Sequence, residues 1–300
     1  MTGSLRKTLA RAALRAVSRP MTQAGVPLKL QRLALDNAAL GMRAPRGLNV
    51  EAIRLGGIPG KRVTPAAAGD HHILYLHGGA YISGGSRSHV PIAGQLANAA
   101  GATAWLIDYR LAPEFPYPTA VDDALAAWRG LLDMKIPASK IAIAGDSAGG
   151  GLSLATTLAI RDAGLPLPAA LALLSPWTDL TLSGESMQSK IAVDPMLGPL
   201  WLEWAAGMYA EGTLRTAPGV SPLFADLAGF PPLLVHVGSD EVLLDDSTFL
   251  ARRAADAGVD VTLRVFDGLW HVFQAQAGMI DEADESVREI GSFIRARCGG

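Results

Sequence analysis

The chain has 300 residues, of which 49% are hydrophobic and 18% are charged, a composition typical of a globular protein with a substantial core. Lys and Arg (26) nearly balance Asp and Glu (28), so the net charge of −2 gives no reason to expect nucleic acid as a partner. The single cysteine, Cys298, excludes an internal disulfide and a Cys-cluster metal site. It favours a reducing compartment, and we therefore expect a cytoplasmic protein.

Two helices are predicted within residues 1–45, separated near Pro20. No run is apolar over the length that spans a bilayer, and the N-terminus lacks the apolar centre of a signal peptide, so integral membrane association is not expected. Lys7, Arg11 and Arg15 recur every four residues and share one face of the first helix. Two interpretations remain open: a helix at a membrane surface and, preferred, an amphipathic helix packed on its own protein.

Strands and helices alternate from Asn49 onward. Apolar or alternating runs predict strands at 50–55, 73–76, 102–107, 141–144, 169–174, 233–237 and 261–266. Helical spacing predicts helices at 91–100, 121–132, after Ser147, at 244–257 and at about 282–296. This alternation predicts an α/β fold with a mostly parallel central sheet and helices on both faces.

Three further segments have a predicted role in the architecture. Gly56–Gly60 is predicted as a turn. The last strand, 261–266, is expected at an edge of the sheet, where a second copy of the chain can pair to form a homodimer. The segment 182–219 interrupts the alternation and is predicted as an insertion, with large side chains at helical spacing.

The stretch from Lys140 to Ala155, KIAIAGDSAGGGLSLA, carries the first indication of chemistry. It predicts a buried strand, a tight turn with Ser147 at its centre, and a helix, which is the context that makes G-x-S-x-G meaningful. Gly145 and Gly149 have no Cβ to clash with neighbouring chain, so the hydroxyl is expected to stand exposed above the sheet. A phosphate-binding loop is the rival interpretation, but neither of its glycine patterns fits here.

An activated serine needs a base and a group that orients the base, and in open α/β sheets such residues follow strands. Asp240 follows the strand 233–237, and His271 follows the strand 261–266. The chain order of serine, aspartate and histidine is that of α/β-hydrolases. We therefore predict Asp240 as the orienting carboxylate, in preference to three neighbours: Glu241, Asp245 and Asp246.

The loop HGGAY, from His77 to Tyr81, follows the strand 73–76 and predicts an oxyanion hole. The negative charge that forms when a serine attacks a carbonyl needs preorganised N–H donors, and glycines let the backbone turn its N–H groups toward a ligand. We expect these donors at four positions: Gly78, Gly79, Ala80 and Ala148.

Several motifs together resemble the hormone-sensitive-lipase-like esterases, most of all the bacterial group with the GDSAG elbow: HGGAY, DYRLAPE (108–114), GDSAGG (145–150), SPWTDL (175–180) and GSDEVLLDD followed by WH. They run in family order from about Asn49 to the C-terminus. The resemblance implies an α/β-hydrolase fold with Ser147 as nucleophile, His271 as base and Asp240 as its orienter. Ala80 stands where the family has a third glycine, which leaves open which donors of that loop act.

The resemblance also implies a domain organisation and a substrate site. Residues 1–45 and part of 182–219 are expected to form a helical cap over a catalytic domain at 46–300. A cap of this kind closes the pocket above the nucleophile, so its capacity for the acyl chain is limited. The side chains expected to line the pocket are Tyr81, Trp201, Trp204 and Met208.

The expected function is hydrolysis of short- to medium-chain carboxylic esters through an acyl-serine intermediate, with no metal and no organic cofactor. The alternatives are a related acyl hydrolase acting on lactones, amides or carbamates, a lipase at a membrane surface, and a protein that binds a small ligand without turnover. The presence of His271 argues against the last of these. Because attack requires a neutral His271, activity is expected to climb between about pH 6 and 7.5.

Overall fold

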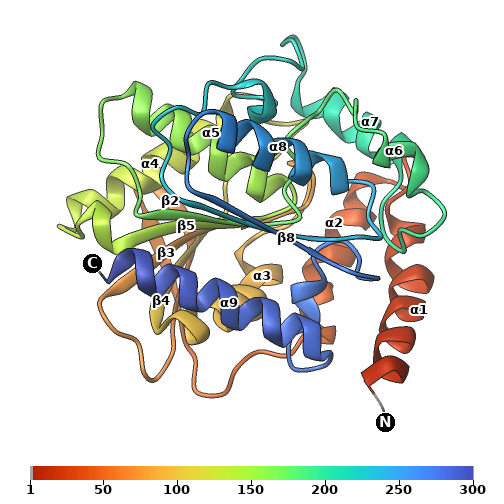
Figure 1. The fold of residues 1–300 in the computed structure, drawn as a ribbon, viewed down its shortest axis with the longest axis horizontal. Coiled ribbons are helices and arrows are strands. Elements are labelled where there is room, and N and C mark those ends of the chain that lie inside the picture. Colours follow the sequence, from red (N-terminus) through yellow and green to blue (C-terminus); the bar gives the residue numbers. More distant parts are fainter. Residues whose placement is uncertain (1–2, 300) are drawn as a thin grey trace.

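An eight-stranded sheet forms the centre of the molecule in the computed structural model, which describes residues 3–299 (Figure 1). The strands are β1 (Asn49–Leu55), β2 (Ile58–Thr64), β3 (His71–Leu76), β4 (Ala102–Ile107), β5 (Ile141–Asp146), β6 (Ala170–Leu174), β7 (Leu233–Gly238) and β8 (Val261–Phe266). Their order is β1-β2-β4-β3-β5-β6-β7-β8, in which β2 is antiparallel to both of its neighbours and all other pairs are parallel. The predicted α/β fold is confirmed, and β8 lies at an edge as expected.

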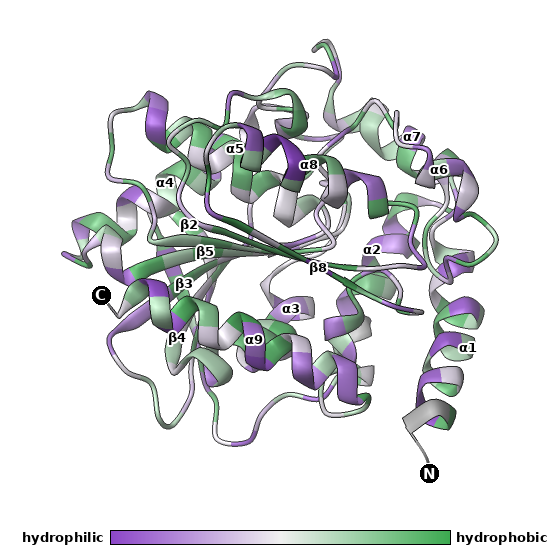
Figure 2. Cartoon of the chain, viewed as in Figure 1, coloured by the Kyte–Doolittle hydropathy of each residue, from purple (hydrophilic) through white to green (hydrophobic). Residues whose placement is uncertain are grey.

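Helices cover both faces of this sheet (Figure 1). On one face lie α4 (Thr119–Asp133), α5 (Ala148–Asp162) and α8 (Leu244–Asp256); on the other lie α3 (Ser86–Ala100) and α9 (Asp281–Cys298). The described chain also contains four short 3-10 helices: η1 (Ala39–Gly41), η2 (Ala138–Lys140), η3 (Pro222–Phe224) and η4 (Phe273–Gln276). The central strands are therefore buried along their whole length, and Figure 2 shows the apolar character of β5.

The two faces of the sheet contribute to two separate hydrophobic clusters. On β5, Ile141 and Ile143 point into the cluster beneath α4 and α5. Ala142 and Ala144 alternate with them and point into the cluster beneath α3 and α9. This packing fixes the direction of β5 and delivers the residue that follows it to the carboxyl edge of the sheet.

The turn predicted at Gly56–Gly60 is wrong in its second half, because β2 begins at Ile58. Only Gly56 and Gly57 turn the chain, with φ of +57° and +87°. A Cβ on Gly60 would lie 2.0 Å from the carbonyl oxygen of Leu106 in β4. That glycine is therefore required by the close approach of a neighbouring strand and does not mark a turn.

Two other boundaries differ from the prediction. Helix α3 begins at Ser86 rather than at Pro91, because the Asp108 carboxylate accepts hydrogen bonds from the Ser86 N–H (2.5 Å) and hydroxyl (3.0 Å). This carboxylate opens the DYRLAPE motif, so one function of that motif is to hold the start of α3. His71 and His72 begin β3 rather than precede it.

Four helices lie together outside the two layers that cover the sheet, at the right of Figure 1: α1 (Gly3–Met21), α2 (Leu28–Ala38), α6 (Ser186–Ser189) and α7 (Pro199–Tyr209). They come from the two segments expected to form a cap. The Trp201 indole N–H in α7 donates to the Gln31 side-chain oxygen in α2 (2.8 Å), so the two segments contact each other. None of the helices described between residues 3 and 299 has the length and apolar character needed to span a bilayer.

Helix α1 packs on its own protein, as preferred, but through its basic face. The Arg15 guanidinium donates to the Ala192 carbonyl (2.6 Å), and that of Arg19 donates to the Ile191 carbonyl (3.1 Å). On the opposite face, Leu5 and Leu9 are 47% and 51% exposed. The guanidinium groups are drawn inward because the segment they contact offers unpaired carbonyl oxygens rather than an apolar surface.

Candidate active site

Ser147 lies at the turn between β5 and α5, at the carboxyl edge of the sheet. Its backbone has φ of 54° and ψ of −123°, a conformation that costs a residue with a Cβ about 1–3 kcal/mol and must be held by its surroundings. Hydrogen bonds from the Ser147 N–H to the Leu174 carbonyl (2.9 Å) and from the Trp177 N–H to the Ser147 carbonyl (2.8 Å) tie the turn to the chain that follows β6.

The glycines of G-x-S-x-G are required by close approach of the backbone. A Cβ on Gly145 would lie 2.3 Å from the Gly149 carbonyl oxygen, and one on Gly149 would lie 2.0 Å from the Leu76 carbonyl oxygen. Contacts under 3 Å of this kind force the backbone to move. The steric argument for the two glycines is thus supported, but the expectation of an exposed hydroxyl is wrong, because Ser147 is only 8% exposed.

The structure pairs His271 with Glu241 and not with Asp240. His271 follows β8, and its Nδ1 lies 2.9 Å from Glu241 Oε2, with both side chains buried. The other oxygen of the Glu241 carboxylate accepts hydrogen bonds from the Gly238 N–H (2.6 Å) and the Ser175 hydroxyl (2.9 Å). The prediction that Asp240 orients His271 is therefore wrong, because the adjacent side chain on this turn is the one that points inward.

Asp240 faces away from His271 and toward the first helix. Its carboxylate lies 2.7 Å from the Arg11 guanidinium, which also donates to the Gly268 carbonyl (2.7 Å) and lies over the Trp270 ring. The ion pair is partly exposed, so it contributes on the order of 0–1 kcal/mol. Asp240 is thus occupied in attaching α1 to the loops that carry Glu241 and His271.

The two remaining carboxylates hold other loops in place. The Asp245 carboxylate accepts the Ser186 N–H (2.7 Å) at the start of α6. The Asp246 carboxylate accepts the N–H groups of Thr178 (2.7 Å) and Asp179 (2.8 Å) in the SPWTDL motif. Neither carboxylate is bonded to His271. Ranking Asp245 and Asp246 below Asp240 in the sequence analysis is consistent with this.

Two residues that the sequence did not single out connect the parts of the site. Ser175, with φ of 47°, donates its hydroxyl proton to Glu241 and accepts the Val272 N–H (3.1 Å), so it links the loops after β6, β7 and β8. Asp194 is fully buried, and its carboxylate accepts the Val242 N–H (3.0 Å) next to Glu241. Ser175 is the first residue of the SPWTDL motif, so the sequence could have indicated its importance. Asp194 lies in the insertion, where no motif marks it.

The surroundings of His271 act on its pKa in opposite directions. Burial alone lowers the pKa, but the hydrogen bond and charge of Glu241, with further contributions from Asp194 and Asp146, outweigh burial and raise the pKa above its usual value. The imidazole is therefore a stronger base than a free histidine. Proton uptake from a serine hydroxyl is favoured accordingly.

The HGGAY loop turns its backbone through a series of left-handed residues. Gly79, Ala80 and Tyr81 have φ of +116°, 54° and 63°. Among the described residues, no hydrogen-bond acceptor faces the N–H groups of Gly79 and Ala80, whereas the Gly78 N–H donates to Asp146 Oδ1 (3.1 Å). The expectation that Gly78 supplies an oxyanion donor is thus wrong, because its only N–H is already used.

Ala148 is the first residue of α5, and its N–H therefore has no acceptor one turn earlier in the helix. The positive end of the helix dipole lies at the same place, where it favours a developing negative charge. Of the four predicted donors, the N–H groups of Gly79, Ala80 and Ala148 thus have no acceptor among the described residues. Ala80 adopts the left-handed conformation despite its Cβ.

The residues predicted to line the pocket fall into two groups. The Tyr81 ring is buried and stacks on that of Tyr209 in α7, with centroids 3.7 Å apart, so this helix lies against the oxyanion loop. Trp204 and Met208 are half-buried on a flank of the same helix. Trp201 is almost fully buried and bonded to Gln31, which gives it a packing role between α7 and α2.

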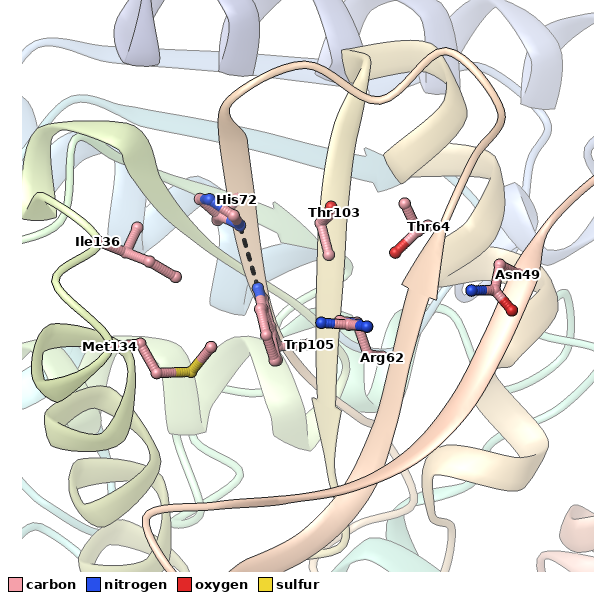
Figure 3. A pocket seen from close by; sticks show the side chains of 8 residues that line it. All are labelled: Asn49, Arg62, Thr64, His72, Thr103, Trp105, Met134 and Ile136. Carbon is pink, nitrogen blue, oxygen red and sulfur yellow. Dashed lines mark hydrogen bonds between the residues drawn. The ribbon is translucent and has the colours of Figure 1, made fainter.

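A surface cavity of about 400 Å³ lies at the opposite end of the sheet (Figure 3). It is lined by residues at the amino ends of β3 and β4 together with their neighbours, and the Trp105 indole N–H donates to His72 Nδ1 across it (3.1 Å). None of the predicted site residues lines this cavity. Within residues 3–299, no three His, Cys, Asp or Glu side chains gather as a metal site would require.

Comparisons with known proteins agree with this architecture. The sequence profile of the family described as alpha/beta hydrolase fold matches residues 73–275. An acetyl-hydrolase from Streptomyces hygroscopicus is 39% identical over 272 residues, which cover 90% of each chain. The crystal structure of an esterase from the bacterial hormone-sensitive lipase family is 38% identical, covers 100% of both chains and has a TM-score of 0.94. The crystal structure of EstE5 soaked with p-nitrophenyl butyrate is 38% identical, covers 98% of this chain and 99% of that chain, and has a TM-score of 0.93. The chain belongs to the α/β-hydrolase fold family and, within it, to the hormone-sensitive-lipase-like esterases.

Proposed function

We propose that this chain is a serine carboxylesterase that hydrolyses short- to medium-chain carboxylic esters. Ser147 is the nucleophile, His271 the general base, and Glu241 the carboxylate that orients it. The observation that supports this proposal most is the buried His271–Glu241 contact of 2.9 Å, made by residues that follow β8 and β7 at the same sheet edge as Ser147. A carboxylate on Nδ1 fixes the tautomer in which Nε2 is free to accept a proton.

The reaction follows from these assignments. His271 removes the hydroxyl proton of Ser147 as the oxygen attacks the ester carbonyl, and the N–H groups of Gly79, Ala80 and Ala148 stabilise the oxyanion. Collapse of this intermediate transfers the proton from His271 to the leaving alcohol and leaves an acyl-serine. His271 then deprotonates a water molecule that attacks the acyl group, and the carboxylic acid leaves as the Ser147 hydroxyl is restored. No metal or organic cofactor takes part.

We further propose that residues 1–45 and the helical part of 182–219 act as a cap over the catalytic domain at 46–300. Two contacts support this: the Tyr81–Tyr209 stack joins α7 to the oxyanion loop, and Arg11 joins α1 to the loops of Glu241 and His271. Ser147 is only 8% exposed, as a covered nucleophile would be. Tyr81, Trp204 and Met208 are proposed to shape the acyl pocket beneath the cap, and Trp201 to hold α7 in place through its contact with α2.

A panel of p-nitrophenyl esters of increasing acyl length tests the substrate class. Each methylene that the pocket buries contributes about 0.8 kcal/mol, a factor of roughly four in kcat/KM, until the pocket is full and overlap costs binding. We therefore expect kcat/KM to reach a maximum at short to medium chains and to fall at long ones. Trp204→Ala and Met208→Ala are expected to move this maximum toward longer chains, because each removes a half-buried side chain from the proposed pocket wall.

Leu200→Ala is the matched control, since Leu200 lies on the same helix and is 82% exposed. It is expected to keep the wild-type chain-length profile. If Trp204→Ala and Met208→Ala fold normally and also keep that profile, the acyl pocket is not formed by α7. A wild-type preference for long-chain triglycerides over every soluble ester would replace the proposed substrate class with that of a lipase.

We also propose a homodimer that forms through β8. The carbonyl groups of Asp260 and Phe266 point toward β7, so in this parallel pair the intervening N–H groups of Val261, Leu263 and Val265 point toward the open edge. Leu263→Pro removes one of them, and light scattering is expected to show a dimer for the wild type and a monomer for this variant. A wild-type monomer contradicts the proposal. The compartment we propose is the cytoplasm, on the basis of the single, buried Cys298.

A further inference from the structure

A buried carboxylate lies directly behind the nucleophile. Asp146 ends β5 and precedes Ser147, and its Oδ1 accepts hydrogen bonds from the Tyr75 hydroxyl (2.6 Å) and the Gly78 N–H (3.1 Å). A Cβ on Gly78 would lie 2.2 Å from Asp146 Oδ2. The carboxylate therefore fills the space beside Gly78 and fixes the direction in which the oxyanion loop leaves β3.

The partner of this carboxylate is a histidine on α3. His89 Nε2 lies 3.5 Å from Asp146 Oδ2, and His89 Nδ1 lies 3.1 Å from the Gly85 carbonyl oxygen. The neighbouring Ser88 hydroxyl lies 2.9 Å from the same carbonyl oxygen and 2.9 Å from His89 Nδ1. One ring nitrogen of His89 therefore faces a carboxylate, and the other faces a carbonyl oxygen and a hydroxyl, an arrangement that suits the imidazolium form because that form donates from both nitrogens.

The electrostatics of the pair agree with this geometry. Burial alone lowers the pKa of His89, but the charge and hydrogen bond of Asp146, with a smaller contribution from Asp36 on α2, raise it above its usual value. In turn, burial raises the pKa of Asp146, but His89 and Tyr75 lower it below its usual value. The adjacent His77 is neutral, because burial lowers its pKa to about 3.

We infer that Asp146 and His89 are positioning residues of the oxyanion hole. Asp146 holds Gly78 and thereby aims the two N–H groups that follow it, and His89 cancels the charge of the carboxylate. Without that cation, a buried negative charge next to the nucleophile would oppose formation of the oxyanion and would favour protonation of His271. The inference rests on the proposed oxyanion hole. It explains in addition why the Asp146 carboxylate is tolerated next to that site.

Three variants assayed with p-nitrophenyl acetate across pH test this role: His89→Gln, Asp146→Asn and the double variant. His89→Gln is expected to lower kcat by roughly 10- to 100-fold, less than the 10²–10³ lost with an oxyanion donor, while KM stays within about twofold. The pH at which the activity of His89→Gln rises on the acidic side of its pH–activity profile, called the acidic limb, should move upward. The reason is that Glu241, Asp194 and an uncompensated Asp146 all raise the pKa of the His271 imidazole. Adding Asp146→Asn should restore most of the lost kcat, since an amide still accepts from Gly78 but carries no charge.

His72→Gln is the matched control, since that histidine lies at the far end of the sheet, and it should leave kcat and the acidic limb as in the wild type. A His89→Gln variant with wild-type kcat and limb overturns the inference, as does a double variant no more active than His89→Gln. If His89→Gln does not fold, the single variant Asp146→Asn tests the inference. The acidic limb of its pH–activity profile must then move to lower pH, and an unchanged limb overturns the inference. Organophosphate labelling of Ser147 in each variant shows whether the esterase assignment itself stands, independently of these results.

Discussion

Ser147→Ala is expected to lower kcat for p-nitrophenyl esters by on the order of 10⁶-fold, the size of the loss when a serine hydrolase is deprived of its nucleophile. Covalent labelling by an organophosphate should disappear at the same time. The fold should persist, because alanine keeps the Cβ and the tie between the turn and the Leu174 carbonyl is made by the backbone. Mass spectrometry of the labelled protein, with circular dichroism of both forms, measures both effects.

Ser175→Ala provides the control for this experiment, since Ser175 is the rival hydroxyl. It is buried, it adopts a left-handed backbone, and it contacts Glu241, yet its proton is already donated to that carboxylate. The variant is expected to remain labelled at Ser147, at a reduced rate because the loops of Glu241 and His271 lose a shared contact. Label found on Ser175 in the wild type would refute the choice of nucleophile.

The turn that carries Ser147 was predictable from the sequence because its constraints are local. A strand, a turn and a helix follow each other within a few residues, and Gly145 and Gly149 meet backbone at 2.3 Å and 2.0 Å, where no other residue fits. The alternation of strands and helices likewise predicted the parallel sheet and placed His271 after its last strand. These inferences needed only near neighbours in the chain and the rule that parallel strands end at one edge.

The features that the sequence did not predict depend on distant partners. Asp240 and Glu241 are adjacent on one turn, and what separates them is that Arg11, far away in the chain, binds the first while Ser175 and His271 bind the second. Gly60 was misinterpreted because a glycine required by a neighbouring strand looks the same in a sequence as one that makes a turn. In each case the deciding contact is tertiary.

Glu241→Gln is expected to lower kcat by roughly 10⁴, the loss that follows when the orienting carboxylate of a serine hydrolase becomes an amide. The glutamine oxygen can still accept from the Gly238 N–H and the Ser175 hydroxyl, so the loop should stay in place. Its NH₂ group then faces His271 Nδ1 and makes that nitrogen an acceptor. The proton is displaced to Nε2, where it blocks uptake of the serine proton.

The pH dependence of the residual activity of Glu241→Gln is a second test of the contact between Glu241 and His271. In the wild type the pKa of His271 is raised above about 6.5, the ordinary pKa of a histidine. The neutral base, and with it the activity, therefore appears only as the pH rises above that value. Glu241→Gln removes the hydrogen bond and charge that raise this pKa and leaves burial, which lowers it. The acidic limb should therefore move to lower pH, in the direction opposite to that expected of His89→Gln.

Asp240→Asn is the matched control, because it makes the same chemical change one residue away. It is expected to weaken only the contact with Arg11, which is partly exposed, so kcat should fall by no more than a few-fold and the acidic limb should not move. Thermal unfolding of both variants separates these effects from loss of the fold. If Asp240→Asn lost as much activity as Glu241→Gln and also shifted the limb, the orienting carboxylate would be Asp240, and the contact seen between Glu241 and His271 would not be the one that operates during catalysis.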